Sequence, residues 1–131
     1  RIVFAGQERQ SIEIEAISLD AFAAGLERPV DVIKFDIQGA EAMAFEGMTQ
    51  ILNDQNNLTI ITEFWPRGLT LSGHDPRQFL EQLLEKGFDV QIIDEQESRL
   101  RTLDIDYALK RYPVEYDTDI FFTNLYCSRA A

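Results

Sequence analysis

Two carboxylates stand where strand-like runs of the sequence end. Asp36 directly follows the apolar run at residues 30–35, and Glu63 lies near the end of a second run at residues 58–64. In open α/β sheets, ligands bind beyond the carboxyl ends of the strands, and neighbouring strands are only about 4.8 Å apart. We therefore expect Asp36 and Glu63 to be catalytic and to converge on one substrate hydroxyl or one cation, where a carboxylate can act as a general base.

The residues around these carboxylates leave structural alternatives open. Asp36 could equally cap the helix that follows it, because a carboxylate accepts hydrogen bonds from the N–H groups of a first helical turn. Trp65 follows Glu63 closely and is a candidate for substrate binding, although an aromatic residue after a strand more often serves packing. Glu41 is expected to be structural, since negative charge is favourable in a first helical turn. Gly39 is expected to allow close packing or an unusual φ angle.

The elements that position these residues indicate an α/β fold. Runs rich in β-branched and aromatic residues predict buried strands, and one alternating run predicts a half-solvated strand. The predicted strands cover residues 11–17, 30–35, 58–64, 89–93 and 119–126. The predicted helices begin after Ser18, at Gly39 with a kink or break at Gly47, at Asp75 with Pro76 in the first helical position, and near Ile105. Because helices separate the earlier strands, we expect those strands to be parallel.

The composition limits the classes of function. The chain has 131 residues, is 45% hydrophobic and carries a formal charge of −11. It can therefore bury a core as a single unit, whereas its negative field disfavours nucleic acid and anionic membrane surfaces as partners. The single Cys127 excludes an internal disulfide. No apolar run approaches the roughly 20 residues of a membrane span, and no signal peptide is visible, so a cytoplasmic location is expected.

The familiar cofactor and nucleophile motifs are missing from the sequence. No two of the seven glycines are spaced as G-x-G, and there is no Walker loop, G-x-S-x-G elbow or H-E-x-x-H motif. The one histidine, His74, is interpreted as a solvated loop residue because nothing places it beside a nucleophile. The sequence therefore shows no complete active site of these types.

Residues 30–41, which read VDVIKFDIQGAE, resemble the signature of the FkbM family of S-adenosylmethionine-dependent methyltransferases. The spacing of a lysine, an aspartate and a G-A-E triplet after the apolar run carries this resemblance. Shorter stretches resemble other parts of the family pattern, and they lie at residues 17–20, 45–47, 60–64, 80–88, 91–94 and 123–125. The sequence departs from the pattern at Gln38, where the family usually has glutamate, and this removes one carboxylate from the loop after the strand.

The resemblance implies part of a class I methyltransferase sheet, which is Rossmann-like. The strands at residues 30–35, 58–64, 89–93 and 119–126 would correspond to strands 4, 5, 6 and 7 of that fold, in the spatial order 4-5-7-6 with the last strand antiparallel. Residues 1–131 would then be the C-terminal portion of a methyltransferase domain, with the N-terminal half of the sheet missing. Within that portion, residues 1–29 would be a lead-in strand and helix, and residues 30–131 the half sheet with its helices.

The same resemblance implies a reaction and its cofactor. The full-length parent would transfer a methyl group from S-adenosylmethionine to the hydroxyl of a small molecule or sugar, whereas the chain alone would be inactive because most cofactor-binding elements are absent. A non-catalytic α/β binding or assembly module that retains half of the fold is the alternative. The exposed edge of the strand at residues 30–35 predicts a homodimer, because unpaired strand edges recruit other strands.

Overall fold

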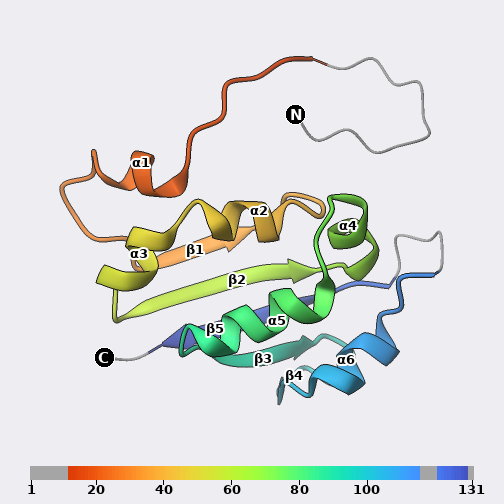
Figure 1. The fold of residues 1–131 in the computed structure, drawn as a ribbon. Coiled ribbons are helices and arrows are strands. Elements are labelled where there is room, and N and C mark those ends of the chain that lie inside the picture. The colour runs from red at the N-terminus through yellow and green to blue at the C-terminus, as the bar shows by residue number, and fades with distance from the viewer. Residues whose placement is uncertain (1–11, 116–120, 130–131) are drawn as a thin grey trace.

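The fold is built on one mixed β-sheet, which contains both parallel and antiparallel strand pairs (Figure 1). The computed structural model describes residues 12–115 and 121–129. The strands are β1 Val32–Phe35, β2 Leu58–Phe64, β3 Asp89–Asp94, β4 Arg99–Thr102 and β5 Thr123–Arg129. They lie in the order β1-β2-β5-β3-β4. β1 and β2 are parallel, β5 is antiparallel to both β2 and β3, and β4 is antiparallel to β3. The carboxyl ends of β1, β2 and β3 therefore share one sheet edge with the start of β5.

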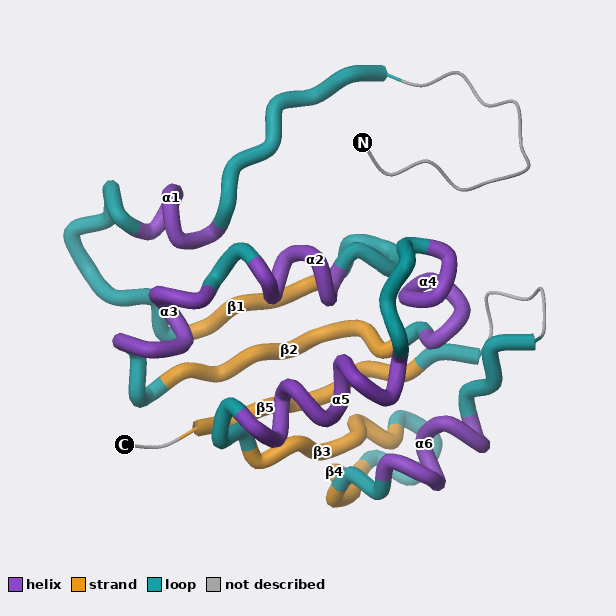
Figure 2. The backbone as a smooth tube through the Cα atoms, in the orientation of Figure 1, coloured by secondary structure: helices purple, strands orange, loops and turns teal. Residues whose placement is uncertain are grey.

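Helices pack on one face of this sheet. The described helices are α1 Leu19–Ala23, α2 Glu41–Glu46, α3 Thr49–Asp54, α4 Pro66–Leu71, α5 Pro76–Glu85 and α6 Ile105–Arg111. α2, α3 and α5 lie in front of the strands in the view of Figure 2, and alternate strand residues such as Ile60, Leu125 and Val90 are buried beneath helices. Burial of this apolar face is the main favourable contribution to folding. None of these helices has the length and apolar character needed to cross a membrane.

Several predicted helix boundaries are confirmed. Ser18 caps α1 by accepting from the backbone N–H of Ala21 at 3.1 Å. Asp75 caps α5, whose first residue is Pro76, and Gly47 separates α2 from α3. These residues act through local backbone chemistry, which the sequence alone carries.

Asp20 ties the first helix to the rest of the fold. Its carboxylate accepts hydrogen bonds from the backbone N–H groups of Gln50 and Ile51, both at 2.9 Å. The backbone N–H of Asp20 also donates to the carbonyl of Gly47 at 3.0 Å. Asp20, which lies in α1, thus caps the N-terminus of α3, because the N-cap residue Met48 makes no side-chain hydrogen bond to that helix.

The prediction of a strand at residues 11–17 is wrong for residues 12–17, the part of that range that the structure describes. Residues 12–18 contain no strand, and Ile12 and Ile14 are 85% and 79% exposed. Ser11 lies outside the described residues. An alternating run becomes a strand only where another strand offers it a partner, and in the described part of the chain none pairs with this segment.

Two other elements were not predicted. α4 follows β2 almost directly, and Pro66 is its first residue, a position in which the fixed φ angle and missing N–H of proline are tolerated. β4 adds a charged edge strand to β3. The last strand begins at Thr123 within the described chain, and residues 119–120 of the predicted strand lie outside the described residues.

Candidate active site

The turn between β1 and α2 has an unusual backbone. Gln38 has a φ angle of 54° and Gly39 one of 96°, so two consecutive residues adopt the left-handed region. A Cβ atom on Gly39 would lie 2.5 Å from the carbonyl oxygen of Gly68, the second residue after Pro66 in α4. Gly39 therefore allows both the turn and the close approach of α4, as the sequence suggested. Strain at Gln38 is of the kind that gathers at functional sites.

This turn directs the side chain of Gln38 toward both predicted catalytic carboxylates. Its Nε2 atom donates to Asp36 Oδ1 at 3.1 Å and to Glu63 Oε2 at 3.5 Å. The structure thus brings Asp36 and Glu63 together at the carboxyl ends of β1 and β2. The amide of Gln38, which the sequence marked only as a departure from the family pattern, lies between them. The catalytic role of the two carboxylates stays a prediction.

Glu63 is the most perturbed carboxyl of this cluster. Only 8% of the residue is exposed. Burial, then the charges of Glu41 and Asp36 and a hydrogen bond with Asp36, raise the pKa of Glu63 to about 7. Its carboxyl group therefore changes its protonation state near neutral pH, which is the range in which a general base is most effective.

Glu41 is completely buried beneath the same turn. Its Oε1 atom accepts from the backbone N–H of Ile37 at 3.2 Å, whereas Oε2 has no partner among the described groups. Burial raises the pKa of Glu41, and backbone N–H groups of the turn partly oppose this shift. The backbone contact supports the structural role predicted for Glu41. Its influence on Glu63 was not foreseen, because it depends on the tertiary fold, which brings two carboxylates 22 residues apart in the sequence close together.

The alternative role of Asp36 as a helix cap is wrong. The N-cap residue of α2 is Ala40, and no side chain caps that helix. The side chain of Asp36 is instead 57% exposed, and its Oδ2 atom lies 4.0 Å from Nζ of Lys34. The carboxylate of Asp36 instead accepts from Nε2 of Gln38 and lies close enough to Glu63 to influence its pKa.

Trp65 packs against the first turn of α4. A Cβ atom on Gly68 would overlap Cε3 of Trp65, so the indole occupies the space that the glycine leaves. Nε1 of Trp65 is buried without a described partner. The packing role is therefore visible in the structure, and the predicted role in substrate binding stays a prediction.

The histidine and the cysteine of the described chain show no catalytic arrangement. His74 is not fully solvated as expected: its side chain is 23% exposed and Nε2 lies 3.3 Å from Oε1 of Glu46. Cys127 is buried, and burial raises the pKa of its thiol to about 12. Across residues 12–115 and 121–129, no group of three or more histidine, cysteine or acidic residues could hold a metal ion.

Comparison with known families assigns the chain. Residues 2–90 match the family described as the methyltransferase FkbM domain, which covers well over half of the sequence. The chain belongs to the FkbM methyltransferase family. No curated protein and no solved structure matches it.

The matched part of this FkbM domain contains the carboxylate cluster. It includes β1, the turn with Gln38, and β2 with Glu63, and it ends at the second residue of β3. The remainder of β3 and all of β4, α6 and β5 lie beyond the match.

Proposed function

We propose that this chain is the C-terminal portion of a methyltransferase domain that methylates a hydroxyl group of a small molecule or sugar. Glu63 is the general base, and Asp36 is its partner at the end of the adjacent strand. Membership of the FkbM family supports methyl transfer. The observation that carries the rest is the position of Glu63 at the end of β2, with a pKa raised to about 7 beside Asp36.

A hydroxyl oxygen is a poor nucleophile until its proton is removed or shared. In the proposed reaction, S-adenosylmethionine supplies the methyl group. Glu63 takes the proton of the acceptor hydroxyl, so that this oxygen could accept the methyl group that bound S-adenosylmethionine would release. The negative charges of Asp36 and Glu41 raise the proton affinity of Glu63, and Gln38 orients its carboxylate. The partly exposed Asp36 accepts a second hydroxyl hydrogen bond from the acceptor.

The described residues do not form a cradle for S-adenosylmethionine. Such a cradle needs backbone that a cofactor can approach, usually at a glycine-rich turn. Gly39 follows β1 at this edge, but the peptide of Gly68 already occupies the space beside it. We therefore propose that other sequence of the complete protein holds the cofactor, as the second half of a class I methyltransferase sheet would require.

The test measures transfer of labelled methyl groups from S-adenosylmethionine to a panel of monosaccharides by the complete protein that carries this chain. We expect Glu63→Gln and Asp36→Asn to lower kcat at least about a hundredfold. The melting temperature should stay nearly unchanged in Asp36→Asn and should not fall in Glu63→Gln, because the glutamine cannot ionise in the buried position. Wild-type kcat should rise with pH through about 7, since the base must be deprotonated. Unchanged turnover in both variants would overturn the assignment, and a protein that transfers no methyl group to any acceptor would favour the binding-module alternative.

A further inference from the structure

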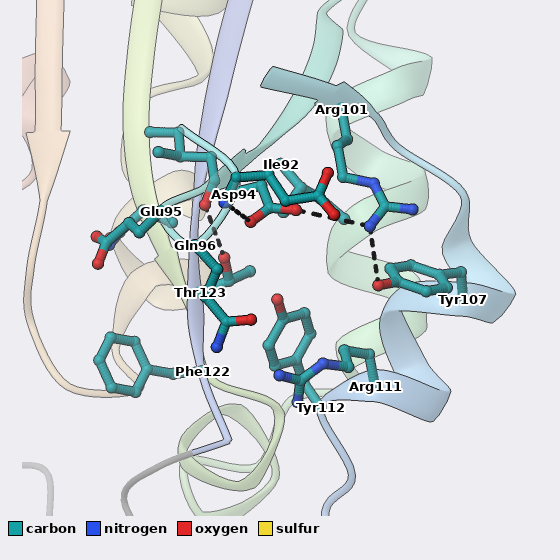
Figure 3. A pocket seen from close by; sticks show the side chains of 13 residues that line it. Ile92, Asp94, Glu95, Gln96, Arg101, Tyr107, Arg111, Tyr112, Phe122 and Thr123 are labelled. Atoms are coloured by element: carbon teal, nitrogen blue, oxygen red, sulfur yellow. Dashed lines mark hydrogen bonds and ion pairs between the residues drawn. The ribbon is translucent and has the colours of Figure 1, made fainter. Parts of the chain in front are cut away.

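A cavity of about 400 Å³ opens at the same sheet edge as the carboxylate cluster (Figure 3). It lies between the end of β3, the start of β5 and α6. Asn124 lines it and pairs with Ile93 on one side and with Glu63 on the other. Because paired strands are about 4.8 Å apart, the cavity begins one strand away from Glu63.

One side of this cavity is a connected polar network. Arg101 Nη1 lies 3.6 Å from Asp94 Oδ2 and donates to the hydroxyl of Tyr107 at 3.1 Å. The guanidinium carbon of Arg101 is 4.7 Å from the centre of the Tyr107 ring. Asp94 also accepts from the backbone N–H of Glu97 at 3.0 Å, and this bond together with Arg101 lowers the pKa of Asp94. The network presents an ionised carboxylate, a guanidinium and an aromatic ring in fixed positions.

Arg111, one helical turn after Tyr107 on α6, adds a cation that has no acidic partner among the described residues (Figure 3). The guanidinium carbon of Arg111 is 5.2 Å from the centre of the Tyr112 ring, and within the described chain Arg111 forms no ion pair. Glu97, which also lines the cavity, is paired with Arg99 at 2.7 Å. Figure 3 shows the carboxylate of Glu95 pointing away from the two arginines. Asp94 is thus paired with Arg101 and Glu97 with Arg99, so Arg111 is the cation of the lining that is left without a carboxylate partner among the described residues.

We propose that this cavity binds the methyl acceptor and that the acceptor is a sugar acid, meaning a hydroxylated ring that carries a carboxylate. Asp94 and Arg101 bind ring hydroxyls, the tyrosine rings pack on the apolar face of the sugar, and Arg111 binds the carboxylate. A ligand held there extends toward Asn124 and presents a hydroxyl to Glu63. That the bound sugar acid is the methyl acceptor rests on the proposed function.

The test is a titration of the 131-residue chain with D-glucuronate, followed by amide chemical shifts in nitrogen-15 NMR spectra without any methyl donor. We expect saturable shifts at residues 92–97, 107–112 and 122–124, and binding of uncharged D-glucose about tenfold weaker. Arg111→Gln should weaken glucuronate binding about tenfold and remove the preference over glucose. Arg111→Lys, which keeps the charge, should restore most of that preference.

The matched control is Lys110→Gln, which removes the same charge from the same turn of α6 at a residue that does not line the cavity. It should change binding less than about twofold, as expected for a screened surface charge. Equal effects of the two glutamine variants, or no saturable shifts at the cavity, would overturn the proposal. The titration contains no methyl donor, so it reports on binding alone. If glucuronate binds here but the complete protein transfers no methyl group to any acceptor, only the proposed function is refuted. If the protein transfers methyl groups but glucuronate does not bind here, only this site is refuted.

Discussion

Gln38 Nε2 lies 3.5 Å from Glu63 Oε2, although 25 residues separate the two in the sequence. The same nitrogen is 3.1 Å from Asp36 Oδ1, so one neutral amide donates to both carboxylates at the ends of β1 and β2. An amide donor stabilises neighbouring carboxylates without adding charge. Gln38 thereby lets Asp36 and Glu63 lie close together in a region that already contains the buried Glu41.

Replacing this amide by a carboxylate should raise the pKa of Glu63. In the Gln38→Glu variant a donor is lost and a like charge is gained, and both changes disfavour the ionised form of Glu63. Carbon-13 NMR titration of the side-chain carboxyl groups should show the pKa of Glu63 about one unit or more above its wild-type value. The control is Gln50→Glu, because Gln50 Nε2 donates to Asp54 Oδ2 at 3.1 Å on an exposed helix surface. That variant should leave Glu63 unchanged, and an unshifted Glu63 in Gln38→Glu would show that the bridge has no electrostatic role.

The raised pKa of Glu63 should also make the fold less stable at higher pH. Its pKa rises from 4.5 in the unfolded chain to about 7 in the folded chain, so between these values the folded state holds the extra proton. The free energy of unfolding should therefore fall as pH increases through this window, by at most about 3.4 kcal/mol for this group. Glu41 contributes in the same direction, because burial raises its pKa too.

Glu63→Gln isolates the contribution of Glu63 to this pH dependence. The variant cannot ionise at this position, so urea unfolding should show it to be more stable than the wild type at pH values above the window and nearly equal to it below the window. The exposed Glu85 on α5 provides the comparison, since Glu85→Gln should change stability little at any pH. A pH dependence that is the same in Glu63→Gln and the wild type would contradict the pKa shift.

The sequence predicted those parts of the fold that depend on local chemistry. Asp75 with Pro76 marked the start of α5, and Gly47 marked the break between α2 and α3. The strand predicted at residues 11–17 does not form at the described residues 12–17, because alternation indicates a strand but does not supply the partner strand that it needs.

The candidate site was predictable only in part. Asp36 and Glu63 could be placed at one sheet edge because each ends a strand-like run. The bridging role of Gln38 could not be predicted, because it depends on a positive φ angle at a non-glycine residue. The packing of Trp65 on Gly68 and the burial of Glu41 likewise depend on how α4 and α2 meet the sheet, which no local pattern encodes.

Gly39→Ala should disrupt the turn that holds Gln38 in place. The Cβ atom of the alanine would lie 2.5 Å from the carbonyl oxygen of Gly68, and the alanine would also have to adopt a φ angle of 96°. We expect a loss of about 2–5 kcal/mol in the free energy of unfolding, from backbone strain and overpacking together. Gly73→Ala is the matched control, because Gly73 has a φ angle of 86° but no atom within 4 Å of the added Cβ. It should cost only about 1–2 kcal/mol in urea unfolding, and equal losses in the two variants would exclude the contact with Gly68 as a cause.

The remaining prediction concerns the free edge of β1. In the described part of the chain β1 pairs only with β2, and residues 12–18 do not cover its other side. The opposite edge of the sheet is β4, where Arg99 and Arg101 discourage pairing with another strand. β1 is more apolar, and Val32 is 59% exposed. We therefore propose that the isolated 131-residue chain forms a two-fold dimer through β1.

Proline at residue 32 tests this dimer without breaking the sheet. The N–H of Thr59 donates to the carbonyl of Asp31 at 2.9 Å, and in a parallel ladder this arrangement turns the N–H of Val32 away from β2. Val32→Pro therefore removes a donor from the free edge and leaves the ladder to β2 in place. Sedimentation equilibrium at micromolar concentration should give a dimer for the wild type and a monomer for Val32→Pro, with circular dichroism confirming that the variant is folded. A monomeric wild type would refute the dimer, and a folded variant that still dimerises would place the interface away from β1.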